Sequence, residues 1–218
     1  MKRNVTLAIC FAIVFAYSLI YGSGAYAAVG CNLTDPDRDV KRIFPQSTSY
    51  KTSIDSVKER GGDKLSKDIE IELGDKLDPY YETNDIPHTI YTVLKGKEII
   101  GYIHGVNQKG MYGGMQIILA VDKKGKILEF YYQKVSSPED SKFKDAKFTN
   151  QFKNLTLADF LHHDAMKGQP CPDDKIAKIK PPTSSNNKDF VATLRGIKMD
   201  LILNNVFIFN NFKRTKSL

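Results

Sequence analysis

GMYGGMQIILAVDKKGKILEFYYQKVSSPED, residues 110–140, contains two apolar segments separated by a short polar turn. MQIILAV and ILEFYYQKV are rich in β-branched and aromatic residues, which favour strands. The DKKG turn at 122–125 favours a tight connection between antiparallel strands. The stretch therefore predicts a β-hairpin that is entered through glycines and left through Ser136 and Ser137.

A second hairpin precedes the first. TIYTVLKGKEIIGYIHGV, residues 89–106, has two strand-like segments on either side of a Lys-Gly-Lys turn. Polar and apolar residues alternate in these segments with the period of two that is typical of strands. NQKGMYGG, residues 107–114, is interpreted as the link between the hairpins. Four strands in this order predict an antiparallel meander sheet.

Helices are predicted on both sides of these strands in the chain. Thr34 or Asp35 is suited to cap a first helix, and Pro36 suits its first turn. Apolar residues recur at three- and four-residue spacing in later segments, which predicts further helices. These segments are 63–79, 148–166 and 189–203. The fold class is therefore α+β, an antiparallel meander sheet of two hairpins packed by flanking helices.

Three details of this prediction depend on weaker signals. Asn187 or Asp189 is expected to cap the last long helix. Residues 46–62 are polar and are expected to be irregular. NNVFIFNNF, residues 204–212, is expected to form a short strand or a docked tail.

The first 27 residues have the parts of a secretory signal peptide. Lys2 and Arg3 precede the apolar segment VTLAICFAIVFAYSLIY, and AYA at 25–27 matches the pattern that signal peptidase cleaves. An uncleaved membrane anchor and a lipoprotein lipidated at Cys31 are the alternatives. In each case the domain faces an exported compartment, periplasmic or equivalent. We divide the chain into a signal peptide at 1–27, an N-terminal helix segment at 28–45 and an α+β domain at 46–218.

The chain is basic. It carries a net charge of +7, and removal of the leader takes away two cations, which leaves +5. No Arg-rich stripe with interleaved aromatic residues is present, so the charge does not indicate a nucleic-acid partner. The charge either serves solubility alone or suits docking to an acidic exported protein, because complementary charge accelerates encounter.

Cysteine usage also fits export. Cys10 lies in the leader, so Cys31 and Cys171 remain. Two thiols in an oxidising compartment usually pair, and we predict a disulfide between them. In the chain-entropy model such a bridge contributes about 4–5 kcal/mol. If Cys31 is lipidated instead, Cys171 is left single. No Cys-x-x-Cys-His motif is present to attach a c-type haem.

No catalytic motif stands out. The sequence lacks a nucleophile elbow, a Walker loop and a dinucleotide-binding glycine motif. The four histidines are not at zinc-ligand spacing with a cysteine or carboxylate, and His104 is interpreted as a half-buried strand residue rather than a base. The chain is therefore expected to be non-catalytic, without a metal site.

The glycines before the central hairpin admit two interpretations. Gly110, Gly113 and Gly114 allow close approach of another backbone or of a planar ligand, or they form a flexible connector. In its context this segment resembles the core of the FMN-binding domain family, which includes the exported flavin subunits of the Rnf complex and of the sodium-pumping NADH:quinone reductase. The resemblance is carried by GYIHGVNQKGMYGGMQIILAVDKKGKILEFYYQKVSSPE, residues 101–139. It implies an FMN-binding-domain-like fold with Tyr112, Gly113 and Gly114 beside the flavin.

Two segments depart from that family's pattern. SSPE at 136–139 stands where the family usually has Glu-Thr-Pro-Gly, which places Ser136 and Ser137 at the expected ligand-side turn. PPTSSNNKDFV at 181–191 stands where covalent members carry Ser-Gly-Ala-Thr. Ser185 then falls at the attachment threonine, with Thr183 and Ser184 beside it. The resemblance therefore implies at most non-covalent FMN, with its phosphate near these residues and the last helix N-terminus.

The SSPE variant together with NQKGMYGGMQI resembles a narrower group within the family. Its members accompany multihaem hydroxylamine- or hydrazine-oxidising cytochromes as small exported proteins. The resemblance implies an accessory protein that binds or helps assemble such a cytochrome. The alternatives are an electron-transfer protein that holds FMN non-covalently, and a purely structural lipoprotein, the membrane being a partner only through the N-terminus or a lipid on Cys31.

Overall fold

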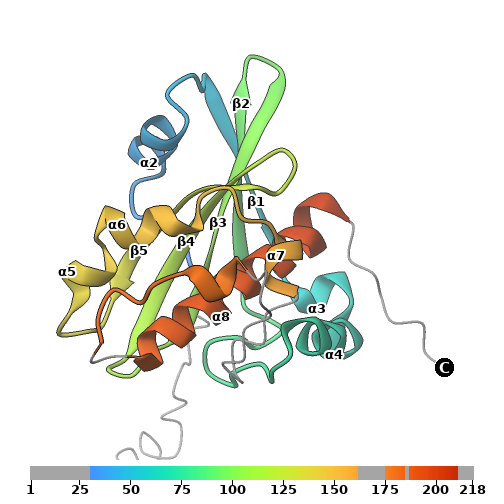
Figure 1. Ribbon diagram of the computed structural model, residues 1–218. Coiled ribbons are helices and arrows are strands. Elements are labelled where there is room, and N and C mark those ends of the chain that lie inside the picture. Colours follow the sequence, from blue (N-terminus) through green and yellow to red (C-terminus); the bar gives the residue numbers. More distant parts are fainter. Residues whose placement is uncertain (1–29, 162–174, 185–186, 211–218) are drawn as a thin grey trace, which may run out of the picture.

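The computed structural model describes residues 30–161, 175–184 and 187–210. The predicted signal peptide, Cys171 and Ser185 lie outside these residues. Five strands form one antiparallel sheet in the order β1-β2-β3-β4-β5, as Figure 1 shows. The strands are β1 (Ser49–Asp55), β2 (His88–Lys95), β3 (Glu98–Lys109), β4 (Gly114–Asp122) and β5 (Ile127–Val135). The predicted α+β class and antiparallel meander are confirmed.

Both predicted hairpin turns are present. Gly96 between β2 and β3 has φ +61°, and Gly125 between β4 and β5 has φ +80°. Only glycine adopts such left-handed conformations without steric cost, so the KGK and DKKG sequences fix the two turns. These turns connect the pairs β2–β3 and β4–β5, in which Thr92 lies opposite Tyr102 and Leu119 lies opposite Phe130.

The sheet is buried on both faces, which explains the unbroken apolar run in β4. Ile117 and Leu119 belong to one core cluster, while Ile118 and Ala120 belong to a second cluster on the opposite face. Successive strand residues point to opposite faces of a sheet, so each face of β4 requires its own cover.

Helix α2 (Pro36–Ile43) covers one of these faces. Asp35 caps it by accepting a hydrogen bond from the Arg38 N–H at 3.1 Å, as the sequence predicted. Phe44, directly after the helix, packs over Gly101 of β3, where an added Cβ would lie 2.5 Å from the Phe44 ring. The predicted N-terminal helix segment is thus part of the core of the sheet domain.

Helix α8 (Asn187–Asn204) covers the other face, together with several short helices. It contacts β3 and β4, and Leu194, Ile197 and Leu201 are buried. The short helices are α5 (Asp140–Phe143), α6 (Ala146–Thr149), η1 (Asn150–Phe152), α7 (Leu157–Leu161) and η2 (Ile176–Lys178). They contribute the buried aromatic residues that the sequence assigned to a helical cover, Phe148, Phe152 and Phe160.

Helices α3 (Val57–Arg60) and α4 (Gly62–Leu73) connect β1 to β2. Leu65, Ile69 and Leu73 form the buried stripe of α4. Gly74 ends the helix in a left-handed conformation, φ +78°, so the helix is shorter than the predicted segment 63–79.

Four details of the prediction were wrong. Residues 46–62 are not irregular, since they contain β1, α3 and the start of α4. β1 was missed because it is an edge strand that is mostly exposed, so it has no apolar alternation. The link between the hairpins is shorter than predicted, because residues 107–109 belong to β3. Residues 205–209 form neither strand nor tail but a π-helical extension of α8, η3 (Asn205–Phe209).

The fourth error concerns Asp189. It does not precede the last helix as a cap but lies within the first turn of α8, where it is fully buried. Its carboxylate faces another part of the chain, as described below.

Candidate functional site

The predicted site residues within the described part of the chain gather at one end of the sheet, around the tip of the β3–β4 hairpin. The tip is closed by a hydrogen bond of 2.8 Å from the Gly110 N–H to the Gly113 carbonyl. Gly113 has φ +142°, and an added Cβ would lie 3.0 Å from the Cβ of Ser136. Glycine is required there for both reasons. The glycine loop and the SSPE turn are therefore in direct contact.

Asp189 holds this tip from the side of α8. Its Oδ1 accepts the backbone N–H of Met111, and a Cβ on Gly110 would lie 2.6 Å from the same oxygen. The Asp189 carbonyl also accepts the Thr193 hydroxyl at 2.7 Å, and Thr193 is in turn hydrogen-bonded to the Tyr132 hydroxyl. Burial raises the pKa of Tyr132, so its hydroxyl stays protonated within this chain of hydrogen bonds.

A second carboxylate lies in the SSPE turn. The Glu139 N–H donates to Ser137 Oγ at 3.3 Å, and Glu139 Oε1 accepts the Thr183 hydroxyl at 2.9 Å. The ammonium of Lys142 lies 2.7 Å from the same oxygen. The structure thus joins Ser137 to Thr183 through Glu139, while Ser184 is exposed. Tyr112 is exposed as well, with 54% of its surface accessible.

This arrangement does not fit an FMN phosphate. A phosphate between the hairpin tip and the start of α8 would lie beside the Asp189 carboxylate, which already holds the Met111 N–H. The Thr183 hydroxyl is likewise engaged by Glu139. Two anionic side chains thus take hydrogen-bond donors that a phosphate needs, and they repel its charge.

A shallow hollow lies beside the hairpin tip. Its volume is about 220 Å³, which is below the roughly 300–1,000 Å³ of typical small-molecule sites. Gly114 forms part of its wall, and an added Cβ there would lie 3.5 Å from the Tyr81 ring. The lining residues are Tyr80, Tyr81, Asn107, Gly114, Met115, Gln116 and Lys134.

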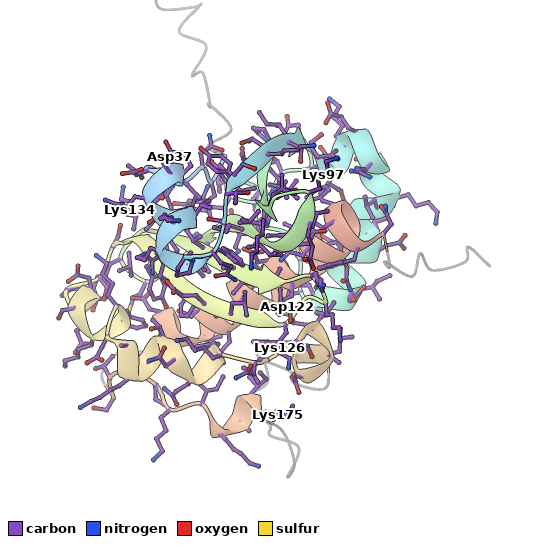
Figure 2. The ribbon with its side chains drawn as sticks, turned by 90° about the horizontal axis from the view of Figure 1, so that it is seen from above. Asp37, Lys97, Asp122, Lys126, Lys134 and Lys175 are labelled. Atoms are coloured by element: carbon purple, nitrogen blue, oxygen red, sulfur yellow. The ribbon has the colours of Figure 1, made fainter. Side chains whose placement is uncertain are left out.

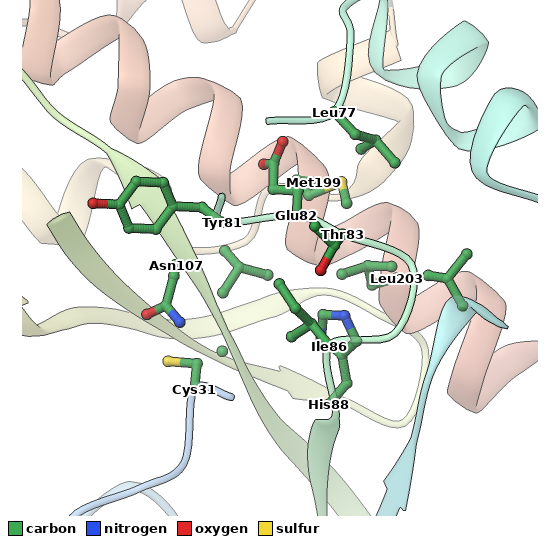
Figure 3. Close-up of a pocket in the computed structure, with 13 residues that line it drawn as sticks. Cys31, Leu77, Tyr81, Glu82, Thr83, Ile86, His88, Asn107, Met199 and Leu203 are labelled. Carbon is green, nitrogen blue, oxygen red and sulfur yellow. The ribbon is translucent and has the colours of Figure 1, made fainter. Parts of the chain in front are cut away.

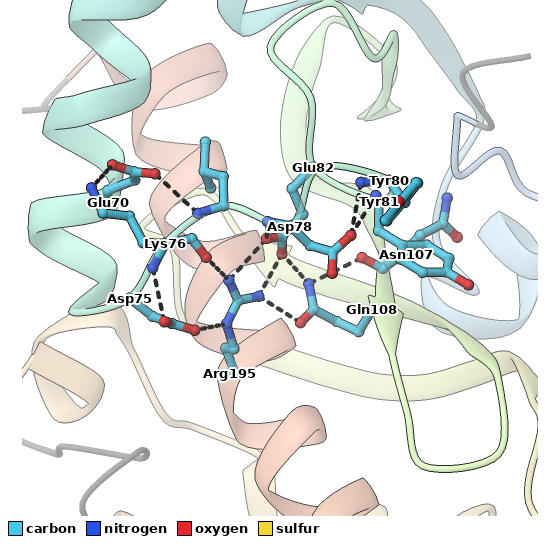
Figure 4. A network of polar contacts seen from close by, with 11 residues as sticks. Glu70, Asp75, Lys76, Asp78, Tyr80, Tyr81, Glu82, Asn107, Gln108 and Arg195 are labelled. Atoms are coloured by element: carbon cyan, nitrogen blue, oxygen red, sulfur yellow. Dashed lines mark hydrogen bonds and ion pairs between the residues drawn. The ribbon is translucent and has the colours of Figure 1, made fainter. Parts of the chain in front are cut away.

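The loop that carries the two tyrosines is fixed by Arg195 of α8, as Figure 4 shows. The Arg195 guanidinium binds both carboxylate oxygens of Glu82, at 2.6 and 2.9 Å, and Asp75 Oδ2 at 2.7 Å. It also donates to the side-chain oxygen of Gln108 on β3 at 2.8 Å. One guanidinium thereby ties the loop to both α8 and the sheet.

A separate polar chain crosses the core, and the sequence did not reveal it. His104 is only 1% exposed rather than half-buried, and its Nδ1 lies 2.9 Å from Oδ1 of Asp200 on α8. Its Nε2 lies 3.1 Å from His88 Nδ1. Asp200 Oδ1 also accepts from the amide of Asn204 at 3.2 Å. Because Asp200 Oδ1 is the acceptor, we assign the ring proton of His104 to Nδ1. His104 Nε2 then accepts the hydrogen bond that His88 Nδ1 donates.

Burial acts against charge on two groups of this chain, His88 and Asp200. Burial, with His104 as a second cause, lowers the pKa of His88 to about 3. Burial raises the pKa of Asp200, and Asp200 Oδ2 and Asn204 Oδ1 have no hydrogen-bond partner within the described residues. A proton on Asp200 is therefore the form that burial favours.

Cys31 and His88 line one small cavity, shown in Figure 3. Its volume of about 10 Å³ is room for a single water at most. Burial, and then the charge of Asp200, raises the pKa of the Cys31 thiol to about 12, so the thiolate needed for nucleophilic chemistry is not formed. The interior around Cys31 therefore does not support catalysis by this residue.

The structure describes one of the two cysteines that were predicted to pair. Cys31 is a free, buried thiol in the structure, and Cys171 lies outside the described residues, so the disulfide stays a prediction. No group of three or more His, Cys, Asp or Glu side chains suited to a metal occurs in the described ranges. In those ranges no helix has both the length and the apolar character to cross a membrane.

Comparison with known proteins adds no assignment. No protein-family model matches the chain, and no curated protein matches it.

Proposed function

We propose that this chain is an exported accessory protein that binds, or helps to assemble, a multihaem cytochrome redox enzyme of the hydroxylamine- or hydrazine-oxidising type. In this proposal the chain has an FMN-binding-domain-like fold but carries no flavin and performs no catalysis itself. The proposal starts from the resemblance of residues 101–139 to that family and to its cytochrome-associated members.

The observation that carries the proposal is the position of Asp189. Its buried carboxylate accepts the Met111 N–H at the point where the resemblance would place a phosphate. Glu139 similarly engages Thr183. Side chains of the protein itself thus occupy the position expected for the phosphate. This arrangement favours binding of a protein partner over binding of FMN.

The charge of the chain supports the same role. A net charge of +7, or +5 without the leader, favours rapid encounter with an acidic protein. Burial raises the pKa of the Cys31 thiol to about 12, so this residue does not supply a thiolate nucleophile.

The test is purification of the tagged chain from the exported fraction of its own cells at low salt. We expect a protein with the visible absorbance of c-type haem to coelute, and to dissociate as salt screens the charges. Elution without a cytochrome, at low salt and without detergent, would contradict the proposal.

The same preparation tests the flavin alternative. We expect its spectrum to lack flavin bands, and calorimetric titration with added FMN to give no binding isotherm at micromolar protein. Stoichiometric flavin in the purified chain would favour the electron-transfer protein instead and would require Asp189 to leave the hairpin tip.

A further inference from the structure

Exposed apolar side chains gather at the hairpin tip. Tyr80 has 72% of its surface accessible, Tyr112 has 54% and Met111 has 51%. Tyr80 lines the hollow whose wall includes Gly114, two residues after Tyr112. Figure 1 shows the tip and the loop before β2 at the same end of the molecule. We call Tyr80, Tyr81, Lys109, Met111, Tyr112 and Lys134 the tip patch.

The tip patch is presented on fixed backbone. The Gly110–Gly113 hydrogen bond and the Asp189 contact hold the segment that carries Met111 and Tyr112. Asp78 Oδ1 accepts the N–H groups of Tyr80 at 2.8 Å and of Tyr81 at 3.1 Å. Aromatic side chains on a preorganised backbone lose little entropy on binding, so they are suited to anchor a protein interface.

The charge of the tip patch is positive. Lys109 ends β3 with its Cα opposite Gly114, and Lys134 lines the hollow next to Gln116. Both lysines are exposed, and neither forms an ion pair within the described residues. Figure 2 shows Lys134 beside helix α2 at the side of the sheet. An apolar centre flanked by two unpaired cations is complementary to a surface with carboxylates around an apolar centre.

We propose that the tip patch is the docking face of the protein, and that its occupant is the acidic surface of the multihaem cytochrome. This inference rests on the proposed function. The matching chemistry is a set of Asp and Glu side chains or haem propionates around an exposed apolar edge. A second copy of the chain fits less well, because pairing this face with itself would bring the lysines of both copies together.

The test compares variants of exposed residues, because substitutions at exposed positions usually change stability little. The tip variants are Tyr112→Ser, Tyr80→Ser and Lys134→Glu. The matched controls are Ile71→Ser on α4, where Ile71 is 67% exposed, and Lys97→Glu at the turn between β2 and β3, the opposite end of β3 from the tip. The probe is the cytochrome that coelutes with the wild-type chain, purified and immobilised, with affinity measured by biolayer interferometry.

We expect Tyr112→Ser to weaken binding about tenfold or more, as for an interface anchor. Lys134→Glu is expected to slow association and to reduce its dependence on salt, while both controls stay within about twofold of wild type. If the tip variants bind like the controls, the docking face is wrong although the proposed function stands. If the wild-type chain binds no cytochrome, both proposals fail. If the tip variants instead dissociate a dimer in sedimentation, the occupant is a second copy and this inference is overturned.

Discussion

The carboxylate of Asp189 in the first turn of α8 accepts the backbone N–H of Met111, 78 residues earlier in the chain. This one contact joins the covering helix to the tip of the central hairpin. It also places an acidic side chain in the first turn of α8, a position that the positive end of the helix dipole favours. The hairpin tip is thus held by a side chain of the covering helix.

We predict that Asp189→Ala lowers the free energy of unfolding by about 1–3 kcal/mol, the cost of leaving a buried donor unpaired. Asp189→Asn is the matched control, because its amide oxygen still accepts from Met111, and its loss should be smaller. Urea denaturation followed by circular dichroism measures both. Equal stability of Asp189→Ala and wild type would show that the tip does not depend on this contact.

The Arg195–Glu82 pair gives a second prediction. The side chains of Arg195 and Glu82 are 12% and 3% exposed. Arg195→Met would leave the Glu82 carboxylate buried without its cation, so we expect a loss of about 3–5 kcal/mol. Arg195→Met combined with Glu82→Gln should recover part of that loss. Thermal and urea unfolding of the two single variants and the double variant measure the coupling.

An exposed arginine provides the comparison. Arg42 pairs with Glu129 but has 44% of its side chain accessible. Arg42→Met is expected to cost less than about 1 kcal/mol, because solvent screens such a pair. If Arg195→Met costs no more than Arg42→Met, the buried network has no special role in fixing the tyrosine loop.

His88 should make the stability of the protein depend on pH. Its pKa is lowered from 6.5 to about 3 in the folded state, so the unfolded chain binds a proton that the folded chain refuses. The contribution of His88 is therefore complete above pH 6.5 and declines as the pH falls towards 3. We expect wild type to lose its stability advantage over His88→Asn as the pH falls from 6.5 towards 3. The Asn side chain keeps a donor for His104 but does not titrate.

Urea midpoints at several pH values check this prediction. His104 and Asp200 are present in both proteins, so the stability difference between wild type and His88→Asn reports the titration of His88. A constant difference across the range would mean that His88 is not protected from protonation.

The parts of the fold that the sequence predicted are those in which local and global signals agree. The DKKG turn and the apolar segments of β4 and β5 have matching period, length and turn chemistry. β1 gave no such signal, because a largely exposed edge strand is held by pairing with β2 rather than by its own apolar residues. A polar segment with no buried face looks the same in sequence whether or not a neighbouring strand pairs with it.

The sequence analysis singled out residues around the hairpin tip but not the contacts that they make. The glycines indicated a close approach near Gly113, and the structure places Ser136 against it. The role of Asp189 was hidden because an aspartate at a helix start is usually a cap. The contacts of Arg195 with Glu82 and of His104 with Asp200 span about a hundred residues, and no local pattern reports them.

Asp200 gives the most direct test of how the core is protonated. Oδ1 accepts hydrogen bonds from His104 and Asn204, while Oδ2 and the Asn204 oxygen lack partners in the described residues. A proton on Oδ2 therefore relieves the charge of a fully buried carboxylate.

Asp200→Asn reproduces this neutral form, and we expect it to change the free energy of unfolding by less than about 1 kcal/mol at pH 7. Asp200→Ala should lower it by about 3 kcal/mol or more, because polar groups lose their partner and packing is lost. Burial raises the pKa of Asp200 above 3.8, so the wild-type carboxyl stabilises the fold at low pH. That contribution is lost as the pH rises through the folded-state pKa. The stability of Asp200→Asn should not decline in this way, because its amide does not titrate. Urea unfolding from pH 4 to 8 separates the cases, since an ionised Asp200 paired with a charged His104 would make Asp200→Asn nearly as destabilising as Asp200→Ala.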